Sequence, residues 1–269
     1  MSSHPETVTL TRGDIEEALR QIGLTRGDIV EVHSSLSSLG WVEGGAATVV
    51  DALMNVVGQE GALVMSAYFV SKPLPLTEQE KARGLLAKVR LYDRDYDGPT
   101  GMGAVADEFR RRPGTVLGPD DGGPICAWGR NAEWLSQGYE SLVEADGWAL
   151  LIGVDIYRCS SMHVAENRVA VPKAIGQHYQ LPEDILRDYP PEEWYVIHSE
   201  PTKSEPQPAS ESIGAWEKVQ AEAECRGLIV KQRIGNAACM LFKARQLVEI
   251  YAEARRSDPF GLYNVERER

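Results

Sequence analysis

Residues 30–45 read VEVHSSLSSLGWVEGG, and this stretch indicates how the chain folds. A β-branched apolar run ends at His33, Ser34 and Ser35, and a loop with three glycines follows it. Such a pattern predicts a buried strand that ends in a tight turn. The hydroxyl groups at that turn could cap a following helix, or they could hold a phosphate or an oxyanion together with backbone N–H groups. The residues alone leave both interpretations open.

The segments that follow this turn complete a strand, helix, strand unit. Residues 46–58 read AATVVDALMNVVG and have the broad apolar face of a helix that packs on a sheet. GALVMSAYF at 61–69 then has the pattern of a buried strand. A crossover of this kind places the end of the first strand beside the start of the helix, where open α/β sheets bind ligands.

Further strands and helices follow the same alternation. WALLIGVD at 148–155 predicts a second buried strand, and the helical segment MHVAENRVAV follows it after a short loop. Capped helices are expected after Thr11 and between Gly101 and Pro113, and the segment 235–256 predicts a strand followed by an amphipathic helix. We therefore predict a single α/β domain over 1–269, a three-layer α/β/α sandwich around a mostly parallel or mixed sheet.

Two segments interrupt this pattern. Residues 70–99 are polar and rich in proline, and they are too long for a plain connection, so we expect a flap or a small helical insertion that borders the site. Residues 182–213 are rich in Pro, Glu and Ser around the strand-like WYVI, which suggests an exposed hairpin or an irregular segment.

The charge of the chain restricts its partners. The formal net charge is −12, with 40 acidic against 28 basic residues. This balance disfavours nucleic acid and anionic membranes as partners and suits a small cationic ligand. No apolar run reaches the length that spans a bilayer, and the first residues lack the pattern of a signal peptide, so we expect a soluble, cytoplasmic protein. A homodimer is compatible with the sequence, which does not determine the oligomeric state.

Metal binding finds little support in the sequence. The four cysteines are isolated, with no CxxC pair, and we expect reduced thiols in the core and no metal. They are Cys126, Cys159, Cys225 and Cys239. HVAEN lacks the second histidine of a HExxH zinc site, and neither GxSxG nor a P-loop occurs, which argues against a metalloprotease, an α/β-hydrolase and a nucleotide triphosphatase.

His163 and Glu166 are the candidate catalytic pair. They are three residues apart on a predicted helix, so both side chains can face the same side. A carboxylate beside an imidazole fixes its tautomer and stabilises the imidazolium, which makes the histidine a competent base. A surface ion pair on a helix would produce the same spacing.

Two clusters of charge have similar alternatives. Arg110, Arg111 and Arg112 form either a solvated helix face or a contact for phosphate groups. An acidic group could bind a polyamine or could simply be solvated loop residues; it comprises Asp93, Asp95, Asp97, Asp120 and Asp121.

Taken together, several segments resemble one family, the aminoglycoside N3-acetyltransferases, also called the antibiotic N-acetyltransferases. HSSLSSLGWVEGGAATVVDAL is similar to the family's first strand, loop and helix. GMGAVADEFRRRPG, AWG at 127–129, LLIGVD, MHVAE and GNAACMLF follow in the family's order, so the resemblance covers nearly the whole chain.

The resemblance implies acetyl transfer from acetyl-CoA to a primary amine, with His163 as general base and no covalent enzyme intermediate. It associates the HSSL turn (His33, Ser34, Ser35 and Leu36) and the MGA segment (Met102, Gly103 and Ala104) with coenzyme A, and Arg110 is the candidate phosphate contact beside them. His33 is either near the cofactor or a buried structural residue. Aminoglycosides are the leading acceptors, with Asp93, Asp95, Asp120 and Asp121 as candidate contacts.

The chain also departs from the family pattern. A His-Pro pair is absent before the AWG strand, a Gly-x-x-Ser-Pro loop is absent between Trp134 and Trp148, and Met240 replaces an expected arginine. Acetylation of another small amine, or coenzyme A binding without aminoglycoside activity, therefore remain alternatives.

Overall fold

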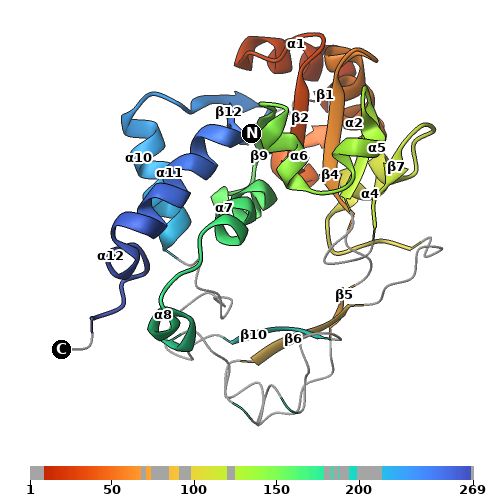
Figure 1. Cartoon of the computed structure of the whole chain (residues 1–269). Coiled ribbons are helices and arrows are strands. Elements are labelled where there is room, and N and C mark those ends of the chain that lie inside the picture. Colours follow the sequence, from red (N-terminus) through yellow and green to blue (C-terminus); the bar gives the residue numbers. More distant parts are fainter. Residues whose placement is uncertain are drawn as a thin grey trace, which may run out of the picture.

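A seven-stranded mixed sheet forms the centre of the fold (Figure 1). The computed structural model describes residues 9–67, 71–73, 85–90, 98–119, 125–178, 183, 187, 194–198 and 214–267. In their order across the sheet the strands are β11 (Val230–Ile234), β12 (Ala237–Lys243), β9 (Trp148–Ile152), β2 (Ile29–Ser34), β4 (Ala62–Ser66), β8 (Ile125–Gly129) and β7 (Val116–Leu117). The predicted strand at 30–34 therefore lies in the middle of the sheet.

The three central strands are parallel, and the next strand on each side is antiparallel to them. β2 pairs in parallel with β4 on one side and with β9 on the other. β12 and β8 pair antiparallel with the outer edges of this trio. Because the carboxyl ends of parallel strands share one edge, the residues after Ser34, Ser66 and Ile152 meet at the same edge of the sheet.

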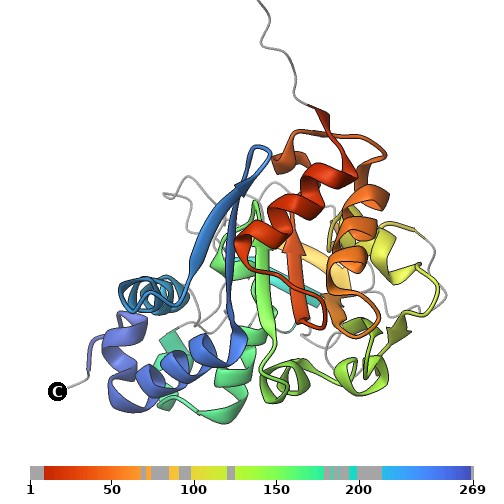
Figure 2. The same cartoon turned by 90° about the horizontal axis from the view of Figure 1, so that it is seen from above.

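Helices cover both faces of the sheet, as Figure 2 shows from above. One face carries α1 (Arg12–Ile22), α2 (Gly45–Val57) and α4 (Ala104–Arg110). The other carries α5 (Ala132–Leu135), α6 (Tyr139–Glu144), α7 (His163–Arg168), α10 (Ala215–Cys225), α11 (Ala244–Ser257) and α12 (Pro259–Tyr263). In β4, Leu63 and Met65 enter the first core and Ala62 and Val64 enter the second, because side chains alternate along a strand. The three-layer prediction is confirmed.

Several further described elements are short. They are β1 (Thr9–Leu10), β3 (Trp41–Val42), α8 (Lys173–His178) and the 3-10 helices η1 (Leu36–Leu39), η2 (Ile156–Arg158) and η3 (Ser160–Met162). β1 pairs in parallel with β3. The predicted start of α1 is confirmed by a capping box, in which the Thr11 and Asp14 side chains each bond the other's backbone N–H.

The two irregular segments pair with one another. β5 (Ser71–Pro73) and β6 (Leu85–Arg90) belong to the first segment, and β10 (Trp194–His198) belongs to the second. β6 pairs antiparallel with both β5 and β10, so WYVI joins a strand from the distant segment. In Figure 1 this small sheet lies below the seven-stranded sheet, beyond the end of β4. The described residues of 70–99 are thus extended rather than helical, and the single-domain assignment stays a prediction.

Cys126, Cys159 and Cys239 are buried thiols, as expected, but Cys225 is exposed at the end of α10. Its prediction as a core residue was wrong because position 225 lies on the outer side of an amphipathic helix whose buried side carries Ala215, Trp216, Val219 and Ala223. Among the helices of the described ranges, none combines the length and the apolar character needed to cross a bilayer.

Candidate active site

Two strand-to-helix junctions meet at the carboxyl edge of the sheet. β2 and β9 are neighbours, and Ser34 lies opposite Ile152 in the register. The Ser35 N–H continues this ladder by donating to the Ile152 carbonyl at 2.9 Å. The loop after β2, which carries the HSSL residues, therefore lies directly beside the loop after β9, which leads to His163.

The HSSL turn is a 3-10 helix held by its own serines. Leu36 is the first residue of η1, and the Ser38 hydroxyl and N–H both donate to the Ser35 carbonyl, at 2.6 and 3.2 Å. The Ser35 and Ser37 hydroxyls lie 3.2 Å apart. Backbone N–H groups of this turn are candidates for holding an anion, but that of Ser35 donates to the sheet ladder instead.

Gly153, the first residue after β9, allows the two loops to pack closely. Its φ of +63° is one that L side chains rarely adopt, and a Cβ there would lie 1.7 Å from the Ser38 hydroxyl oxygen. Gly153→Ala should therefore lower the free energy of unfolding by the backbone strain and by overpacking against η1.

Gly227→Ala is the matched control, because Gly227 has a φ of +70° but a Cβ added there would meet no atom within 4 Å. We expect about 1–2 kcal/mol for the control and about 1–3 kcal/mol more for Gly153→Ala, measured by urea denaturation. Equal losses in the two variants would contradict the close packing of the loops.

His33 forms a buried pair with Glu31 on β2. The His33 Nε2 lies 2.6 Å from the Glu31 Oε1, and the Glu31 side chain is completely buried. The Ser160 amide nitrogen also lies 3.3 Å from the same ring nitrogen. A ring nitrogen that carries a hydrogen has no lone pair in the ring plane to accept another, and the shorter contact with the carboxylate assigns the hydrogen to Nε2. Of the two roles open for His33, this contact supports the structural one.

Glu31 also holds the loop after β9. Its Oε1 accepts the Ser161 N–H at 3.1 Å, and the Cys159 Sγ lies 4.0 Å from Oε2. Burial raises the pKa of Cys159 well above its usual value, and the negative charge of Glu31 adds to this effect. The thiol therefore stays protonated. Glu31 thus connects β2 to the turn that precedes the candidate base.

A small cluster of hydroxyls lies at the same edge. The Ser66 Oγ at the end of β4 lies 2.6 Å from the Tyr139 hydroxyl and 3.1 Å from the Ser160 Oγ. Sequence reasoning missed Ser66, Tyr139 and Ser160, although the end of a central parallel strand was a signal that could have identified Ser66.

His163 and Glu166 form the predicted pair. The His163 Nδ1 lies 2.6 Å from the Glu166 Oε2, at the start of α7. The His163 side chain is 53% exposed, whereas that of Glu166 is 17% exposed. With Nδ1–H donating to the carboxylate, the lone pair of Nε2 is directed away from Glu166, and no hydrogen bond to Nε2 occurs among the described residues.

Glu166 is fixed by side chains that the sequence did not reveal. Its Oε1 accepts the Trp216 Nε1–H at 3.2 Å and the Tyr251 hydroxyl at 2.9 Å. The Trp216 ring also meets the His163 ring edge-on, with centroids 4.9 Å apart. Burial raises the pKa of Glu166, but the hydrogen bonds of His163 and Tyr251 and the charge of Arg255 outweigh it, so the net pKa is lowered. Glu166 is therefore an anion at neutral pH.

The MGA segment lies next to the HSSL turn. A Cβ at Gly103, whose φ is +95°, would lie 3.7 Å from the Ser34 carbonyl oxygen. Ala104 begins α4 and is exposed, and the Met102 N–H donates to the Thr100 hydroxyl at 3.2 Å. The predicted cofactor segments from two parts of the sequence therefore lie side by side.

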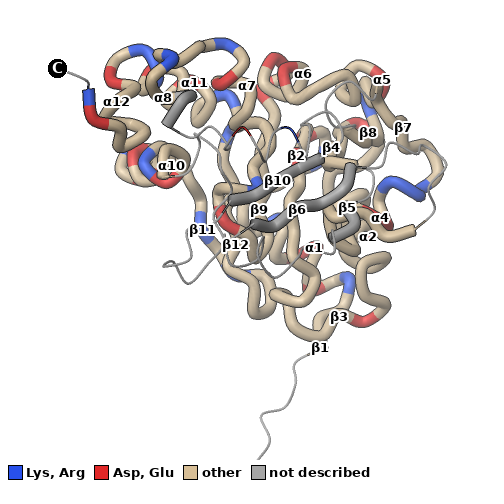
Figure 3. Tube along the Cα trace, turned by 90° about the horizontal axis from the view of Figure 1, so that it is seen from below, with Lys and Arg blue, Asp and Glu red and all other residues tan. Residues whose placement is uncertain are grey.

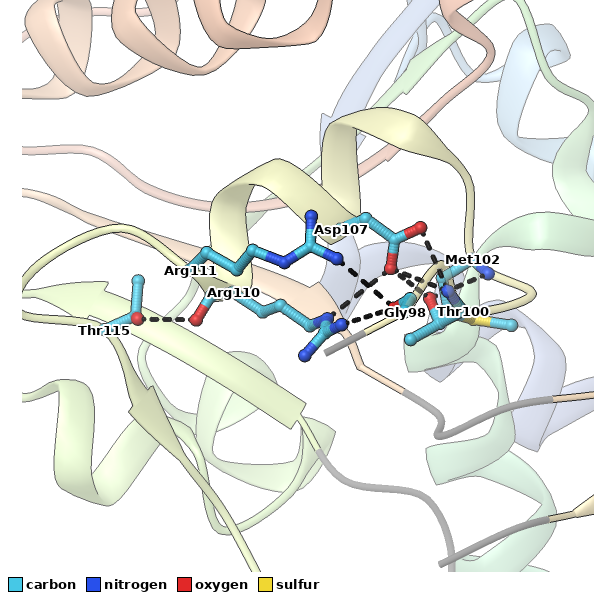
Figure 4. A network of polar contacts seen from close by, with 7 residues as sticks. All are labelled: Gly98, Thr100, Met102, Asp107, Arg110, Arg111 and Thr115. Atoms are coloured by element: carbon cyan, nitrogen blue, oxygen red, sulfur yellow. Dashed lines mark hydrogen bonds and ion pairs between the residues drawn. The ribbon is translucent and has the colours of Figure 1, made fainter. Parts of the chain in front are cut away.

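Arg110 belongs to a network that orders this segment (Figure 4). Its Nη2 donates to the Gly98 carbonyl at 2.7 Å, and its Nε lies 3.5 Å from the Asp107 Oδ1. Asp107 in turn accepts the Thr100 N–H and hydroxyl. These contacts give Arg110 a role in holding residues 98–102, and its contact with a phosphate stays a prediction.

The acidic group lies outside the described residues. It comprises Asp93, Asp95, Asp97, Asp120 and Asp121, and its role in acceptor binding is untested. Within the described ranges, no three His, Cys, Asp or Glu side chains gather as a metal site requires.

Comparison with known proteins places this geometry in a family. The model of the family described as aminoglycoside 3-N-acetyltransferase matches residues 32–255. The aminoglycoside N(3')-acetyltransferase-like protein YokD of Bacillus subtilis is 33% identical over 190 residues, which are 64% of this chain and 70% of YokD. An aminoglycoside N(3)-acetyltransferase III of a Salmonella species is 30% identical over 189 residues, and 65% of that protein is covered. The aligned parts thus span about two thirds of these relatives.

Solved structures have the same fold. A mutant of aminoglycoside acetyltransferase AAC(3)-IVa in complex with a gentamicin superimposes with a TM-score of 0.70 at 19% identity, and the match covers 96% of this chain and 92% of that one. AAC-IIIb in a binary complex with CoASH gives 0.63 at 19% identity, with 91% and 96% covered. The family match over most of the chain and the shared fold lead to one conclusion: this chain belongs to the aminoglycoside 3-N-acetyltransferase family.

Proposed function

We propose that the chain transfers the acetyl group of acetyl-CoA directly to a primary amine of an aminoglycoside, with His163 as general base. The observation that carries the proposal is the 2.6 Å contact of the His163 Nδ1 with a fixed carboxylate of Glu166. This contact selects the tautomer whose Nε2 can accept a proton, and the exposed ring can reach an amine.

The reaction needs one base and one electrophile. Nε2 of His163 removes a proton from the acceptor's ammonium group, and the neutral nitrogen attacks the thioester carbonyl carbon. The bond from this carbon to sulfur breaks, and the coenzyme sulfur leaves with the electron pair and takes up the second proton, which the acylated nitrogen gives up as the amide forms. Glu166 stabilises the imidazolium that forms, since its own lowered pKa keeps it ionised.

Coenzyme A is proposed to bind across the HSSL turn and the MGA segment. Support comes from the closeness of Gly103 to Ser34 and from the hydroxyls of Ser34 and Ser35 at the carboxyl edge of the sheet. Leu36, Met102, Ala104 and Arg110 belong to the same two segments. AAC-IIIb, which shares the fold, was solved with CoASH.

The acceptor is proposed to be a polycationic aminoglycoside. The net charge of −12 supports a cationic ligand, because a negative field raises the encounter rate and local concentration of cations. Lys and Arg nevertheless lie among Asp and Glu in the described elements, and a basic stretch marks the end of α4 (Figure 3). The relatives are named for aminoglycosides, and one structural neighbour was solved with a gentamicin.

Release of free thiol from acetyl-CoA tests this proposal. Several aminoglycosides, a monoamine sugar and an amino acid are compared at low and high salt. We expect the highest kcat/KM for aminoglycosides and a decrease with added salt, because exposed charges are screened over roughly 8 Å at physiological ionic strength. Equal values for all amines without salt dependence would reject the aminoglycosides and retain acetyl transfer. No thiol release with any amine would reject acetyl transfer as well.

Glu166→Gln should change the pH dependence of turnover. A protonated His163 cannot act as a base, so the rate decreases in acid. Glutamine keeps the shape of the side chain but removes the negative charge that stabilises the imidazolium, and the acid limb should therefore move to lower pH. A pH–rate profile of both proteins measures this shift. An unmoved limb would mean that Glu166 does not interact with the catalytic base.

A further inference from the structure

The two carboxylate oxygens of Glu166 have different hydrogen-bond partners. Oε2 faces the His163 Nδ1, whereas Oε1 accepts both the Trp216 Nε1–H and the Tyr251 hydroxyl. These donors come from α10 and α11, far from α7 in the sequence. A carboxylate whose Oε1 is held by two donors cannot rotate freely, so Oε2 stays directed at His163.

A buried arginine lies behind this carboxylate. Arg255 is 3% exposed, and its Nη1 lies 3.3 Å from the Tyr251 hydroxyl. It also contacts the Tyr263 hydroxyl, which lies 2.7 Å from that of Tyr251. Its Nε donates to the Val169 carbonyl at 2.8 Å, just after the end of α7. Arg255 therefore holds the helix that carries His163 as well as the tyrosine that holds Glu166.

We propose that Tyr251 and Arg255 are positioning residues of the transfer reaction, which fix and charge-balance Glu166 so that its other oxygen orients His163. The inference rests on the proposed role of His163 as base. Tyr251 supplies the hydrogen bond, and Arg255 supplies a buried positive charge close to the carboxylate. Such partners offset part of the hydration that a buried carboxylate loses, and the contacts of Glu166 with His163 and Trp216 remain when either partner is removed.

The ionisation states of the neighbours agree with this arrangement. Burial raises the pKa of Tyr251 far above its usual value, and the negative charge of Glu166 adds to this effect. The hydroxyl therefore keeps the proton that it donates in the hydrogen bond. Among the described residues, the charged and titratable groups that contact Glu166 or its partners are His163 on its own helix, Tyr251 and Arg255 on α11, and Tyr263 on α12. Arg168, also on α7, is paired with Glu140 of α6.

Tyr251→Phe removes the hydrogen bond with little change of shape. We expect kcat to fall roughly tenfold, the effect of one hydrogen bond to a charged group, with KM for acetyl-CoA nearly unchanged. Tyr157→Phe is the matched control. Tyr157 stacks on Trp216 and its hydroxyl accepts the Gly214 N–H, but it does not contact Glu166. The control should keep wild-type turnover. An equal loss of kcat in both variants would mean that Tyr251 contributes through packing and not through its hydrogen bond to Glu166.

The positioning role also predicts the direction in which the acid limb of the pH–rate profile moves in Arg255→Met and Tyr251→Phe. Each removes a group that stabilises negative charge on Glu166, and Arg255→Met also removes a positive charge near the imidazolium. The imidazolium should then be favoured, and the acid limb should move to higher pH, opposite to the shift in Glu166→Gln. If Arg255→Met does not fold, Tyr251→Phe alone carries the test. A shift to lower pH in either variant overturns the proposal.

A double-mutant cycle separates this inference from the proposed function. If Tyr251 acts through Glu166, then Tyr251→Phe should lower kcat little further in a Glu166→Gln background. Full multiplication of the two effects would overturn the positioning role while His163 remains the base. If instead His163→Ala keeps wild-type turnover, His163 is not the base. That result rejects the proposed function itself, and with it the positioning role that rests on it.

Discussion

His163→Ala should lower turnover by roughly a hundredfold or more, the usual size of a general-base effect, and should leave coenzyme A binding nearly intact. The base acts on the acceptor amine, whereas the proposed cofactor residues lie on the HSSL turn and the MGA segment. The exposed ring of His163 makes only one hydrogen bond among the described residues, so its loss should disturb the fold little. Thiol release gives kcat, and calorimetric titration gives the affinity for coenzyme A.

Asn167→Ala is the control for local damage to α7. Asn167 is exposed on the same helix, next to Glu166, and takes no part in the hydrogen bonds described for that carboxylate. We expect turnover of this variant within about twofold of wild type, since exposed substitutions away from such contacts have small effects. If His163→Ala retained more than about half of wild-type turnover, the general-base role would be wrong.

Glu31→Ala should produce the largest loss of stability, about 3–5 kcal/mol, because it leaves buried donors without an acceptor and an empty space in the core. The change leaves the Ser161 N–H and the His33 Nε2–H without their acceptor at the centre of the sheet. Urea denaturation measures the loss. Glu43→Ala, at an exposed glutamate in the loop after β3, should change the free energy of unfolding by about 0.5 kcal/mol or less.

Glu31→Ala also tests whether the contact between the loops after β2 and β9 affects turnover. Because Glu31 holds the turn before His163, we expect turnover of the folded fraction to fall as well. Glu31→Gln keeps an acceptor oxygen and should lose less stability than Glu31→Ala. Equal stability of Glu31→Ala and Glu43→Ala would show that the buried pair contributes nothing to the junction.

The parts of the fold that depend on local sequence could be predicted. The strand Ile29–Ser34, the helix after its glycine loop and the strand Ala62–Ser66 follow from apolar patterns over a few residues. The pairing of His163 with Glu166 follows from helical spacing alone. The closeness of the HSSL and MGA segments was expected only through the resemblance to a family.

The missed features depend on contacts between distant segments. Trp216 and Tyr251 lie on amphipathic helices and look like ordinary core residues, because nothing nearby in sequence reveals which carboxylate their polar atoms meet. The pairing of β6 with β10 joins two segments that are far apart along the chain. The hydrogen bond of the Ser35 N–H could not be predicted because its acceptor, the Ile152 carbonyl, belongs to another strand.

The order of these segments along the chain also has a consequence for biosynthesis. Translation produces His163 and Glu166 long before it produces Trp216, Tyr251 and Arg255. A nascent chain that ends shortly after α7 therefore contains the imidazole and its carboxylate but none of the donors that fix Oε1. Domains fold largely as units during synthesis, so the fully oriented base arises only after α11 has left the ribosome and packed against α7.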